Sequence, residues 1–231
     1  MGAATARALS AAGFELMLGA RRQDRINKLA SELNARAHVL DVTRPESIES
    51  FVAACPQTID VLVNNAGVAI GLDAVEVSRD EDWRQMWETN VLGVVRLTRT
   101  LLPTLRRSSD PRLIVIGSTS SVETYKGGAG YTSTKHALRA VVRTLRLELL
   151  GEPIRVTEIS PGAAETEFSI RRFSGDRERA RAVYEGMRPL TGDDVAECVV
   201  FAATRPKHVN IDEIVVRPLD QASASDVYRD S

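Results

Sequence analysis

The strongest candidates for chemistry in this sequence are a tyrosine and a lysine four residues apart, Tyr131 and Lys135. They lie in the segment GGAGYTSTKHAL, whose pattern is helical, so both side chains project from one helix face. A phenol alone titrates at about pH 10 and is a poor base at neutral pH. A neighbouring ammonium group lowers this pKa, which suits general acid–base catalysis. A lone pair at this spacing is more often an exposed surface pair, so a site requires further polar residues.

Such polar residues occur where apolar segments end. Ser118 ends the segment RLIVIGS, 13 positions before Tyr131. Two asparagines end the segment VLVNN, the motif ISPG closes another, and Asn90 lies within a predicted helix, where its propensity is poor. In a doubly wound sheet the carboxyl ends of the strands form the ligand crevice, so these residues are expected to share one site. The set is Asn64, Asn65, Asn90, Ser118, Pro161 and Gly162.

Six short apolar segments and the helical patterns between them predict the scaffold. The expected strands are 14–19, 37–42, 59–65, 112–118, 154–160 and 212–218. Several are apolar on both faces, which is typical of a parallel sheet covered by helices. The expected helices are 3–12, 23–34, 79–105, 131–150 and 192–204. This alternation predicts an α/β fold with a doubly wound parallel sheet.

Three local signals predict where helices begin and end. Ser78 with Glu81 has the spacing of a capping box that opens the helix 79–105. Pro103 is expected to end or kink that helix, because proline lacks the backbone N–H. Thr191 is expected to cap the last helix.

Composition and charge exclude several classes of function. The 231 residues are 43% hydrophobic and 26% charged, as in a single globular domain spanning 1–231. A net charge of −1 favours neither nucleic acid nor anionic lipid as a partner, and no membrane span or secretory signal is visible. We therefore expect a cytoplasmic protein in which Cys55 and Cys198 are small buried side chains. The three histidines lack metal-ligand spacing, so no metal site is expected.

Together, these motifs resemble the short-chain dehydrogenase/reductase family. The resemblance rests on NNAG (Asn64 to Gly67), Asn90, the set Ser118, Tyr131 and Lys135, and PGxxxT (Pro161 to Thr166), and it extends from Gly2 to the end of the chain. It implies a three-layer, Rossmann-like fold and hydride transfer with a nicotinamide cofactor.

The resemblance also implies a role for each catalytic candidate. Tyr131 passes a proton to or from the substrate oxygen, and Lys135 lowers the pKa of Tyr131 and bonds the nicotinamide ribose. Ser118 orients the carbonyl or alcohol, and Asn90 holds a water that links Lys135 to solvent. The cofactor supplies the hydride, and the protein supplies position and charge.

The residues after the first expected strand indicate which dinucleotide binds. An acidic residue there bonds the adenosine 2′-hydroxyl, whereas Arg21 and Arg22 suit a 2′-phosphate, so we expect NADP. The alternative is a solvated basic helix start. Asp41 and Val42 resemble the adenine-contacting pair of the family. The remaining cofactor-binding candidates are Asn65, Tyr131, Lys135, Pro161, Gly162 and Thr166.

The segment 165–188 is expected to form a substrate flap. Its pattern resembles the subgroup of NADP-dependent 3-hydroxy acid dehydrogenases, which act on serine, allo-threonine or 3-hydroxypropionate. Arg171 and Arg172 then meet a substrate carboxylate, or they are solvated arginines balanced by the acidic residues Glu165, Glu167 and Asp176. The flap begins one residue shorter than the family pattern, which leaves open which side chain meets the substrate.

The front of the family pattern is incomplete. The family begins with a strand and a glycine-rich turn, TGxxxGxG, and Gly2 matches the last glycine of that turn. Without the strand, the middle of the sheet is expected to have a gap, and much of the pyrophosphate site is missing. Either the natural product starts upstream, which we favour, or the chain folds with a rearranged cofactor side.

The leading interpretation is NADP-linked oxidation of a small 3-hydroxy acid. A same-fold alternative is a reductase of bulkier ketones or aldehydes, and an alternative from another class is a non-catalytic scaffold with a crippled cofactor site. By analogy with the family, helices 79–105 and 131–150 are expected to form a homodimer or homotetramer. Residues 221–231 are expected to form a polar tail that is mobile or contacts another subunit.

Overall fold

The computed structural model describes residues 1–230 and contains all six predicted strands. All strand pairs are parallel, and β1 pairs with β2 while the other four pair in the order β3-β4-β5-β6. The predicted parallel α/β fold is therefore confirmed. The strands are β1 (Met17–Ala20), β2 (Arg36–Val39), β3 (Val61–Asn64), β4 (Arg112–Ile116), β5 (Arg155–Pro161) and β6 (Glu213–Val216).

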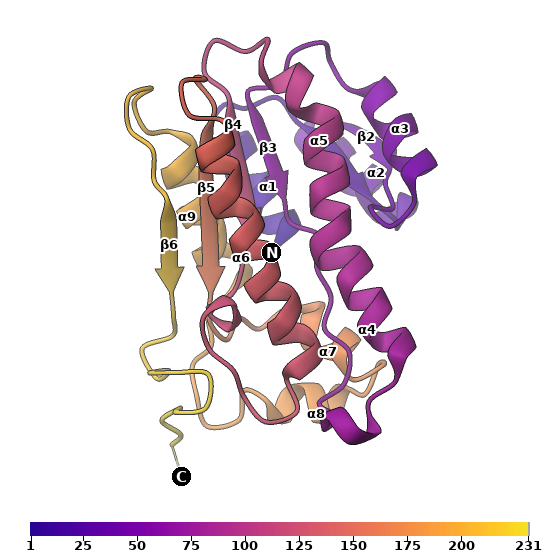
Figure 1. Cartoon of the computed structure of the whole chain (residues 1–231), viewed down its shortest axis with the longest axis vertical. Helices are drawn as coiled ribbons and strands as arrows, with labels where there is room; N and C mark the ends of the chain where they lie inside the picture. The colour runs from indigo at the N-terminus through magenta and orange to yellow at the C-terminus, as the bar shows by residue number, and fades with distance from the viewer. Residues whose placement is uncertain (231) are drawn as a thin grey trace.

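Helices cover both faces of this sheet, so the architecture has three layers. Figure 1 shows α4, α5 and α6 in front of the four-stranded sheet and α1 and α9 behind it. The longer helices are α1 (Gly2–Ala11), α2 (Gln23–Leu33), α3 (Pro45–Ala54), α4 (Asp80–Trp87), α5 (Gly93–Leu105), α6 (Ala129–Glu148) and α9 (Gly192–Ala203), and the short helices α7 (Glu167–Arg172) and α8 (Arg177–Ala182) lie in the flap.

Strand β4 shows why the apolar segments are buried on both sides. Its alternate residues Leu113 and Val115 belong to the core cluster beneath α5 and α6, whereas Ile114 and Ile116 belong to the cluster that includes α9. Successive side chains of a strand point to opposite faces, so burial of both faces of β4 favours apolar residues at successive positions. This is the pattern from which the sequence predicted a parallel sheet.

The sheet is divided between β1 and β3. Among residues 1–230, β1 has hydrogen-bonded ladder contacts only with β2, and β3 has them only with β4. The gap expected in the middle of the sheet is therefore present. Apolar side chains from both sides of it, including Leu16 and Val63, pack against the cluster that contains Val195 of α9. Side-chain packing, and not strand pairing, thus holds the two parts of the sheet together.

The predicted helix ends meet different outcomes. The capping box at Ser78 is wrong, because Arg79 occupies the cap of α4 and Ser78 instead donates to Val75 O and accepts from Trp83 Nε1. Pro103 lies inside α5, two residues before its end. The cap at Thr191 is confirmed, with Asp194 completing a capping box. Within residues 1–230, we find no helix whose length and apolar character would allow it to span a membrane.

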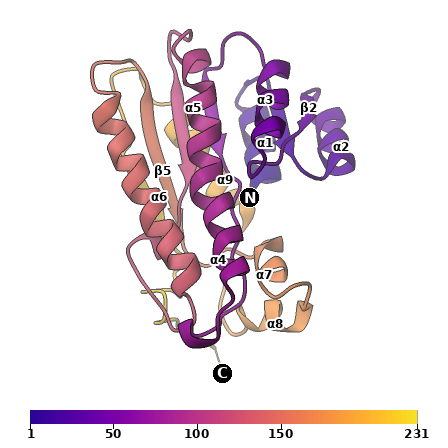
Figure 2. The same cartoon turned by 45° about the vertical axis from the view of Figure 1, so that its right-hand side comes forward.

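The flap lies beyond the carboxyl ends of the strands. Figures 1 and 2 show α7 and α8 at that end of the molecule, next to the beginnings of α4 and α6. The backbone of Arg172 accepts a hydrogen bond of 2.9 Å from Gly71 N, which ties the flap to the loop after β3. Asp230 N donates to Gly186 O, so the predicted polar tail contacts the flap. Ser231, also assigned to that tail, lies outside the described residues.

Candidate active site

The first two turns of α6 place Tyr131 and Lys135 together at the carboxyl ends of the strands. Both side chains are buried, and the Lys135 Nζ atom lies 5.9 Å from the centroid of the Tyr131 ring. Lys135 Nζ donates a 2.9 Å hydrogen bond to Ile116 O, the last carbonyl of β4. The helix therefore presents a phenol and an ammonium group on one face, against the end of the central strand.

Ser118 reaches the same place from the other side. It follows β4 and caps the short 3-10 helix Thr119–Ser121, where its Oγ atom accepts a 3.1 Å hydrogen bond from Ser120 N. The side chain is buried, and hydrogen bonding between Ser118 and the Tyr131 hydroxyl favours the ionised phenol. The pair Ser118 and Tyr131 can thus hold one oxygen atom of a substrate between them.

Burial dominates the ionisation of both groups on α6. It raises the pKa of Tyr131 to about 12, with Ser118 and Arg172 acting in the opposite direction. It lowers the pKa of Lys135 to about 8, opposed by the nearby Glu158 carboxylate. This differs from the lowered Tyr131 pKa expected from the sequence. The physical reason is that burial destabilises the phenolate more than the Ser118 hydroxyl and the Arg172 guanidinium stabilise it.

Asn90 links α6 to the loop that follows β3. It lies in a π-helical turn, Glu88–Leu92, where it is fully buried. Its Nδ2 atom donates to Val68 O and Thr134 Oγ1, and its Oδ1 atom accepts from Val68 N. A Cβ atom at Gly67 would lie 3.6 Å from Asn90 Oδ1 and 3.8 Å from Lys135 Nζ. The motif NNAG therefore lies beside the lysine, and the Asn90 amide fixes it there.

Glu158 is a member of this region that the sequence reasoning missed. It lies in β5 with 1% of its surface exposed, and its Oε1 atom accepts a hydrogen bond from Ser160 Oγ. Burial, followed by Glu213, raises the pKa of the Glu158 carboxyl, while Ser160, Arg139 and Lys135 lower it. The only signal in the sequence was a glutamate within a predicted strand, in the segment RVTEIS.

Arg172 brings a cation from the flap to Tyr131. Its guanidinium carbon lies 5.3 Å from the centroid of the Tyr131 ring, and it donates a hydrogen bond to the Tyr125 hydroxyl. The Arg172 Nε atom is buried and has no hydrogen-bond partner among residues 1–230. A buried donor without a partner is costly unless a ligand satisfies it. Arg172 therefore fits an anionic group next to the phenol.

Comparison of the chain with known proteins identifies its family. A family model described as short chain dehydrogenase matches residues 1–177.

The chain belongs to the short-chain dehydrogenase family.

Two curated relatives match this dehydrogenase over most of its length. An uncharacterized oxidoreductase of Mycobacterium tuberculosis is 56% identical over 225 residues, covering 97% of this chain and 89% of that protein. An NADP-dependent 3-hydroxy acid dehydrogenase of Schizosaccharomyces pombe is 40% identical over 227 residues, covering 94% of this chain and 88% of the relative. The resemblance stated from the motifs is therefore confirmed.

A solved structure of a family member is also similar. The closed form of serine dehydrogenase complexed with NADP⁺ superposes with a TM-score of 0.93 and is 38% identical, covering 98% of this chain and 94% of that one. The Rossmann-like, three-layer fold is thereby confirmed.

The edge of the dehydrogenase near β1 carries the predicted arginines. Arg22 Nη1 and Arg25 Nη1 bind the two carboxylate oxygens of Glu167, at 2.8 and 2.5 Å. Arg25 was not among the predicted residues, although it follows Arg22 by three positions. Arg21 instead lies near Asp41, whose carboxylate accepts hydrogen bonds from the backbone and hydroxyl of Thr43. This edge thus contains a cluster of guanidinium groups of the kind that binds phosphate.

The other predicted cofactor residues follow β2, end or follow β5, or cap α7. Val42 is buried against Gly93 of α5, and Pro161 ends β5. Gly162 N donates to Val216 O, and Thr166 caps α7 through its hydroxyl.

A dinucleotide fits the donors that these residues offer. Lys135 Nζ has three N–H donors and uses one on Ile116 O, so it can bind ribose hydroxyls as well. The first backbone N–H groups of α1 have no side-chain cap, as at an anion-binding helix end. Asn65 Oδ1 is buried without a hydrogen-bond partner among residues 1–230, and its amide packs so closely on Gly2 that a Cβ atom there would lie 2.7 Å from Asn65 Nδ2.

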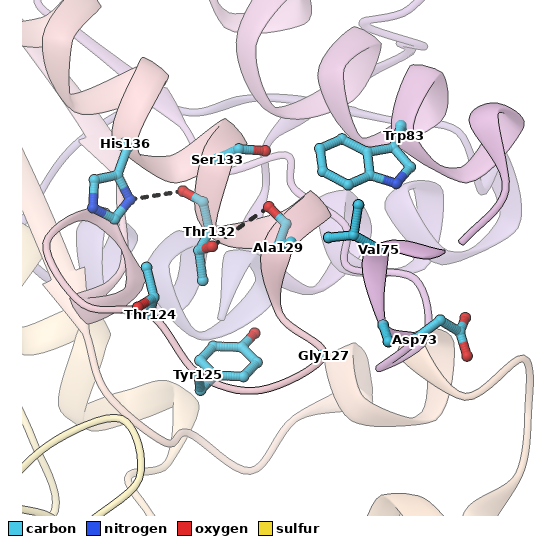
Figure 3. Close-up of a pocket in the computed structure, with 11 residues that line it drawn as sticks. Asp73, Val75, Trp83, Thr124, Tyr125, Gly127, Ala129, Thr132, Ser133 and His136 are labelled. Atoms are coloured by element: carbon cyan, nitrogen blue, oxygen red, sulfur yellow. Dashed lines mark hydrogen bonds between the residues drawn. The ribbon is translucent and has the colours of Figure 1, made fainter. Parts of the chain in front are cut away.

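A hollow of the dehydrogenase lies beside this site. Figure 3 shows it between Trp83 and Val75 on one side and Thr132, Ser133 and His136 of α6 on the other, and its volume is about 410 Å³. Tyr131 does not line it, although Gly127 and Ala129 do. A smaller hollow next to it does include Tyr131, together with Met86 and Gly130. Of these two hollows, Tyr131 therefore borders only the smaller one.

Proposed function

We propose that the chain is an NADP-dependent dehydrogenase that transfers a hydride between NADP and the hydroxyl-bearing carbon of a small 3-hydroxy acid, of the serine, allo-threonine or 3-hydroxypropionate type. Family membership and the NADP-dependent relatives support the cofactor and the reaction class. The Arg172 guanidinium beside Tyr131 carries the substrate assignment, because it lies next to the phenol that would bind the reacting oxygen.

The proposed chemistry divides between Tyr131, Ser118 and Lys135. When bound, the nicotinamide supplies or accepts the hydride. With a pKa of about 12 the Tyr131 phenol is protonated at neutral pH, so it can donate its proton to the oxygen of a carbonyl that is being reduced. Ser118 holds that oxygen in line with the phenol. The positive charge of Lys135 stabilises the phenolate that forms, and in the reverse direction it helps the phenolate accept the proton of an alcohol.

The carboxylate of a 3-hydroxy acid is separated from the carbinol carbon by a single carbon atom. A cation close to the phenol is therefore needed to bind it, and Arg172 meets this condition. The neighbouring Arg171 belongs to the arginine cluster near β1, where Arg21, Arg22 and Arg25 all lower its pKa after the effect of burial. Of the two arginines considered from the sequence, Arg172 is the one we propose for the substrate.

Turnover of matched substrates tests this assignment. Oxidation of 3-hydroxypropionate and of its uncharged methyl ester is followed by NADPH absorbance, in the wild type and in Arg172→Gln. We expect the substitution to lower kcat/KM for the acid by about 10- to 100-fold, the value of a hydrogen bond to a charged group, and to leave the ester nearly unchanged. Equal losses for both compounds, or a preference of the wild type for aromatic ketones, would refute the 3-hydroxy acid assignment.

The cofactor assignment has its own test. We propose that Arg21 and Arg22 bind the 2′-phosphate of NADP, with Asp41 and Val42 at the adenine and with Asn65, Pro161, Gly162 and Thr166 along the rest of the dinucleotide. Replacing both Arg21 and Arg22 by alanine should weaken NADP binding by about 10-fold or more while changing NAD binding little, as measured by calorimetric titration. An equal loss for the two cofactors would contradict the role of these arginines.

Two further properties belong to this proposal. We propose that the enzyme works in the cytoplasm and assembles as a homodimer or homotetramer through helices α4, α5 and α6. The large hollow in Figure 3 lies between α6 and the region of Trp83, on the surface that these helices share. Light scattering on the purified protein gives its mass in solution directly, and a monomer at micromolar concentration would contradict the assembly.

A further inference from the structure

Glu167 joins two parts of the molecule that the sequence keeps far apart. It is the first residue of the flap helix α7, and both of its carboxylate oxygens bind arginines at the start of α2. The Glu167 Oε2 atom lies 2.8 Å from Arg22 Nη1, and Oε1 lies 2.5 Å from Arg25 Nη1. These contacts span 145 and 142 positions of the chain. The flap is therefore attached directly to the edge at which the 2′-phosphate of NADP is proposed to bind.

The charges in this cluster do not balance. Arg22, Arg25 and Arg171 carry three positive charges, and Glu167 supplies one negative charge among them. Arg21, the next guanidinium, lies in the field of Asp41. Two positive charges are thus left uncompensated, which is the charge that a phosphate monoester dianion neutralises.

The donors of the two arginines are also only partly used. Each of Arg22 and Arg25 contacts Glu167 through Nη1, and a guanidinium has five N–H donors in a planar fork. Within the described residues 1–230, Nε and Nη2 of each side chain form no hydrogen bond, so they are available for phosphate oxygens. One guanidinium can therefore bind the Glu167 carboxylate and a phosphate at the same time, so the phosphate need not displace the flap.

We propose that Arg22 and Arg25 bridge the 2′-phosphate of NADP and Glu167, so that the cofactor's phosphate fastens the flap over the active site. This inference rests on NADP as the cofactor and is independent of the substrate. It makes Glu167 a positioning residue that acts through the two arginines. NAD lacks the 2′-phosphate, so the positive charges of Arg22, Arg25 and Arg171 continue to repel one another when NAD is bound. The flap is therefore attached less firmly with NAD than with NADP.

Limited trypsin digestion measures the attachment without any turnover. The flap contains its own cleavage sites, because Arg177, Arg179 and Arg181 lie in and around α8 and are exposed. The rate of flap cleavage follows the population of the open flap when opening is fast. The full chain is digested in the presence of saturating ligand, and two pairs of ligands are compared. The first pair is NADP and NAD, and the second is adenosine 2′,5′-bisphosphate and adenosine 5′-monophosphate. The members of each pair differ in the 2′-phosphate, so each comparison isolates its effect.

In the wild type we expect the ligands with a 2′-phosphate to slow flap cleavage about three- to tenfold relative to their partners without it, which is the range for two exposed ion pairs. Glu167→Gln should lose this difference, because its neutral amide no longer attracts both arginines. The matched control is Glu165→Gln, which removes the same charge two positions away. Within residues 1–230, Glu165 forms no ion pair, whereas Glu167 forms two. The control should therefore behave as the wild type.

Three outcomes would overturn the proposal. One is protection that persists in Glu167→Gln, and another is the absence of any difference between the ligands in the wild type. The third is faster flap cleavage with NADP, which would show that the phosphate displaces Glu167. None of these outcomes bears on the substrate, because oxidation of 3-hydroxypropionate is measured separately.

Discussion

At the scale of single residues, burial sets the chemistry of Tyr131 and Lys135. The phenol has a pKa raised to about 12 and the ammonium a pKa lowered to about 8, both because water is excluded around them. Each group therefore holds its neutral form more firmly than it would in water. A substrate oxygen that gains negative charge next to them has a proton donor at hand, and this is why we place the reaction there.

Removing the phenol hydroxyl tests that placement. Tyr131→Phe keeps the ring and its edge contact with Phe168, at 5.6 Å between centroids, but removes the proton. We expect turnover to fall by about 10²- to 10⁴-fold, the usual contribution of general acid–base catalysis, with NADP binding largely retained. NADPH absorbance and calorimetric titration measure the two quantities. Normal turnover in the variant would show that another group moves the proton.

Burial of the charged Lys135 side chain is expected to reduce the stability of the fold. The pKa of Lys135 is lower in the folded state than in the unfolded state. Below about pH 8 the side chain is charged in both states, so the wild type is destabilised by the full cost of burying the charge. This destabilisation disappears as the pH rises from 8 to 10.5, because the folded state binds the proton less tightly than the unfolded state. Lys135→Met removes this pH dependence along with the hydrogen bond to Ile116 O. The free energy of unfolding of the variant, relative to wild type, should therefore fall by about 3 kcal/mol between pH 7 and pH 10.5.

Urea unfolding at several pH values measures that difference. Loss of the hydrogen bond to Ile116 O changes the free energy of unfolding by the same amount at every pH. The prediction therefore concerns how the difference between variant and wild type changes with pH, and not its absolute size. A difference that stays constant across this range would mean that Lys135 titrates normally in the folded protein.

Gly117 shows how tightly Glu158 is packed beneath the site. A Cβ atom at Gly117 would collide with Glu158 Oε1, which is held in β5 by burial and by Ser160. We expect Gly117→Ala to lower the free energy of unfolding by about 1 to 3 kcal/mol through overpacking. The double variant Gly117→Ala, Glu158→Ala should recover part of this loss, as a thermodynamic cycle would show. If the two substitutions changed the free energy of unfolding additively, the Cβ atom added at Gly117 would not collide with Glu158.

At the scale of elements, local patterns predicted the strands better than the helix ends. All six strands follow from apolar runs, since strands that are covered on both faces are rich in apolar residues, although the fully buried β5 also contains Arg155 and Glu158. Ser78 has the right residue type and spacing for a cap. However, the short helix Val75–Val77 that precedes it engages its hydroxyl, so α4 begins without a side-chain cap. A capping motif is decided by the chain on both sides of it.

The contribution of a helix cap can be tested at Thr191, the N-cap of α9. The Thr191 hydroxyl accepts a hydrogen bond from Asp194 N, and the Asp194 carboxylate accepts hydrogen bonds from the backbone N–H and the hydroxyl of Thr191. We expect Thr191→Ala to cost about 1 kcal/mol of stability, the usual value of an N-cap. Because α9 packs on the cluster that joins the two sheets, thermal unfolding should report the loss as one cooperative transition. An unchanged melting temperature would mean that the cap contributes nothing net.

At the scale of the whole molecule, the divided sheet implies two regions of unequal stability. Strands β4 and β5 have hydrogen-bonded neighbours on both sides, whereas β1 and β3 each have an edge at the gap. Regions with fewer backbone partners open at lower free energy. The unit made of β1, α2 and β2 is therefore expected to open before the rest.

Amide hydrogen exchange measures this order of opening. Peptides covering residues 14–42 should exchange roughly tenfold faster or more than peptides covering β4 and β5, at neutral pH and without ligand. NADP should reduce the difference, because its adenosine end is proposed to bind Arg22 in the less stable region. Equal protection of the two regions would show that packing across the gap is as strong as strand pairing.

Much of this protein could be predicted from sequence because the signals were local. The spacing of Tyr131 and Lys135 along one helix, and the polar residues after each apolar run, are properties of short segments. The sequence by itself therefore determined the parallel α/β fold and the family. It also determined which residue types were present for the reaction.

The tertiary structure decided what depends on contacts between distant segments. Arg171 and Arg172 are adjacent and chemically identical, yet one joins the arginine cluster at β1 and the other lies over Tyr131. The ion pairs of Glu167 and the burial of Glu158 likewise depend on which elements meet. Burial and long-range charge arise only when the chain is packed, and these two quantities set the pKa values and the proposed roles of these residues.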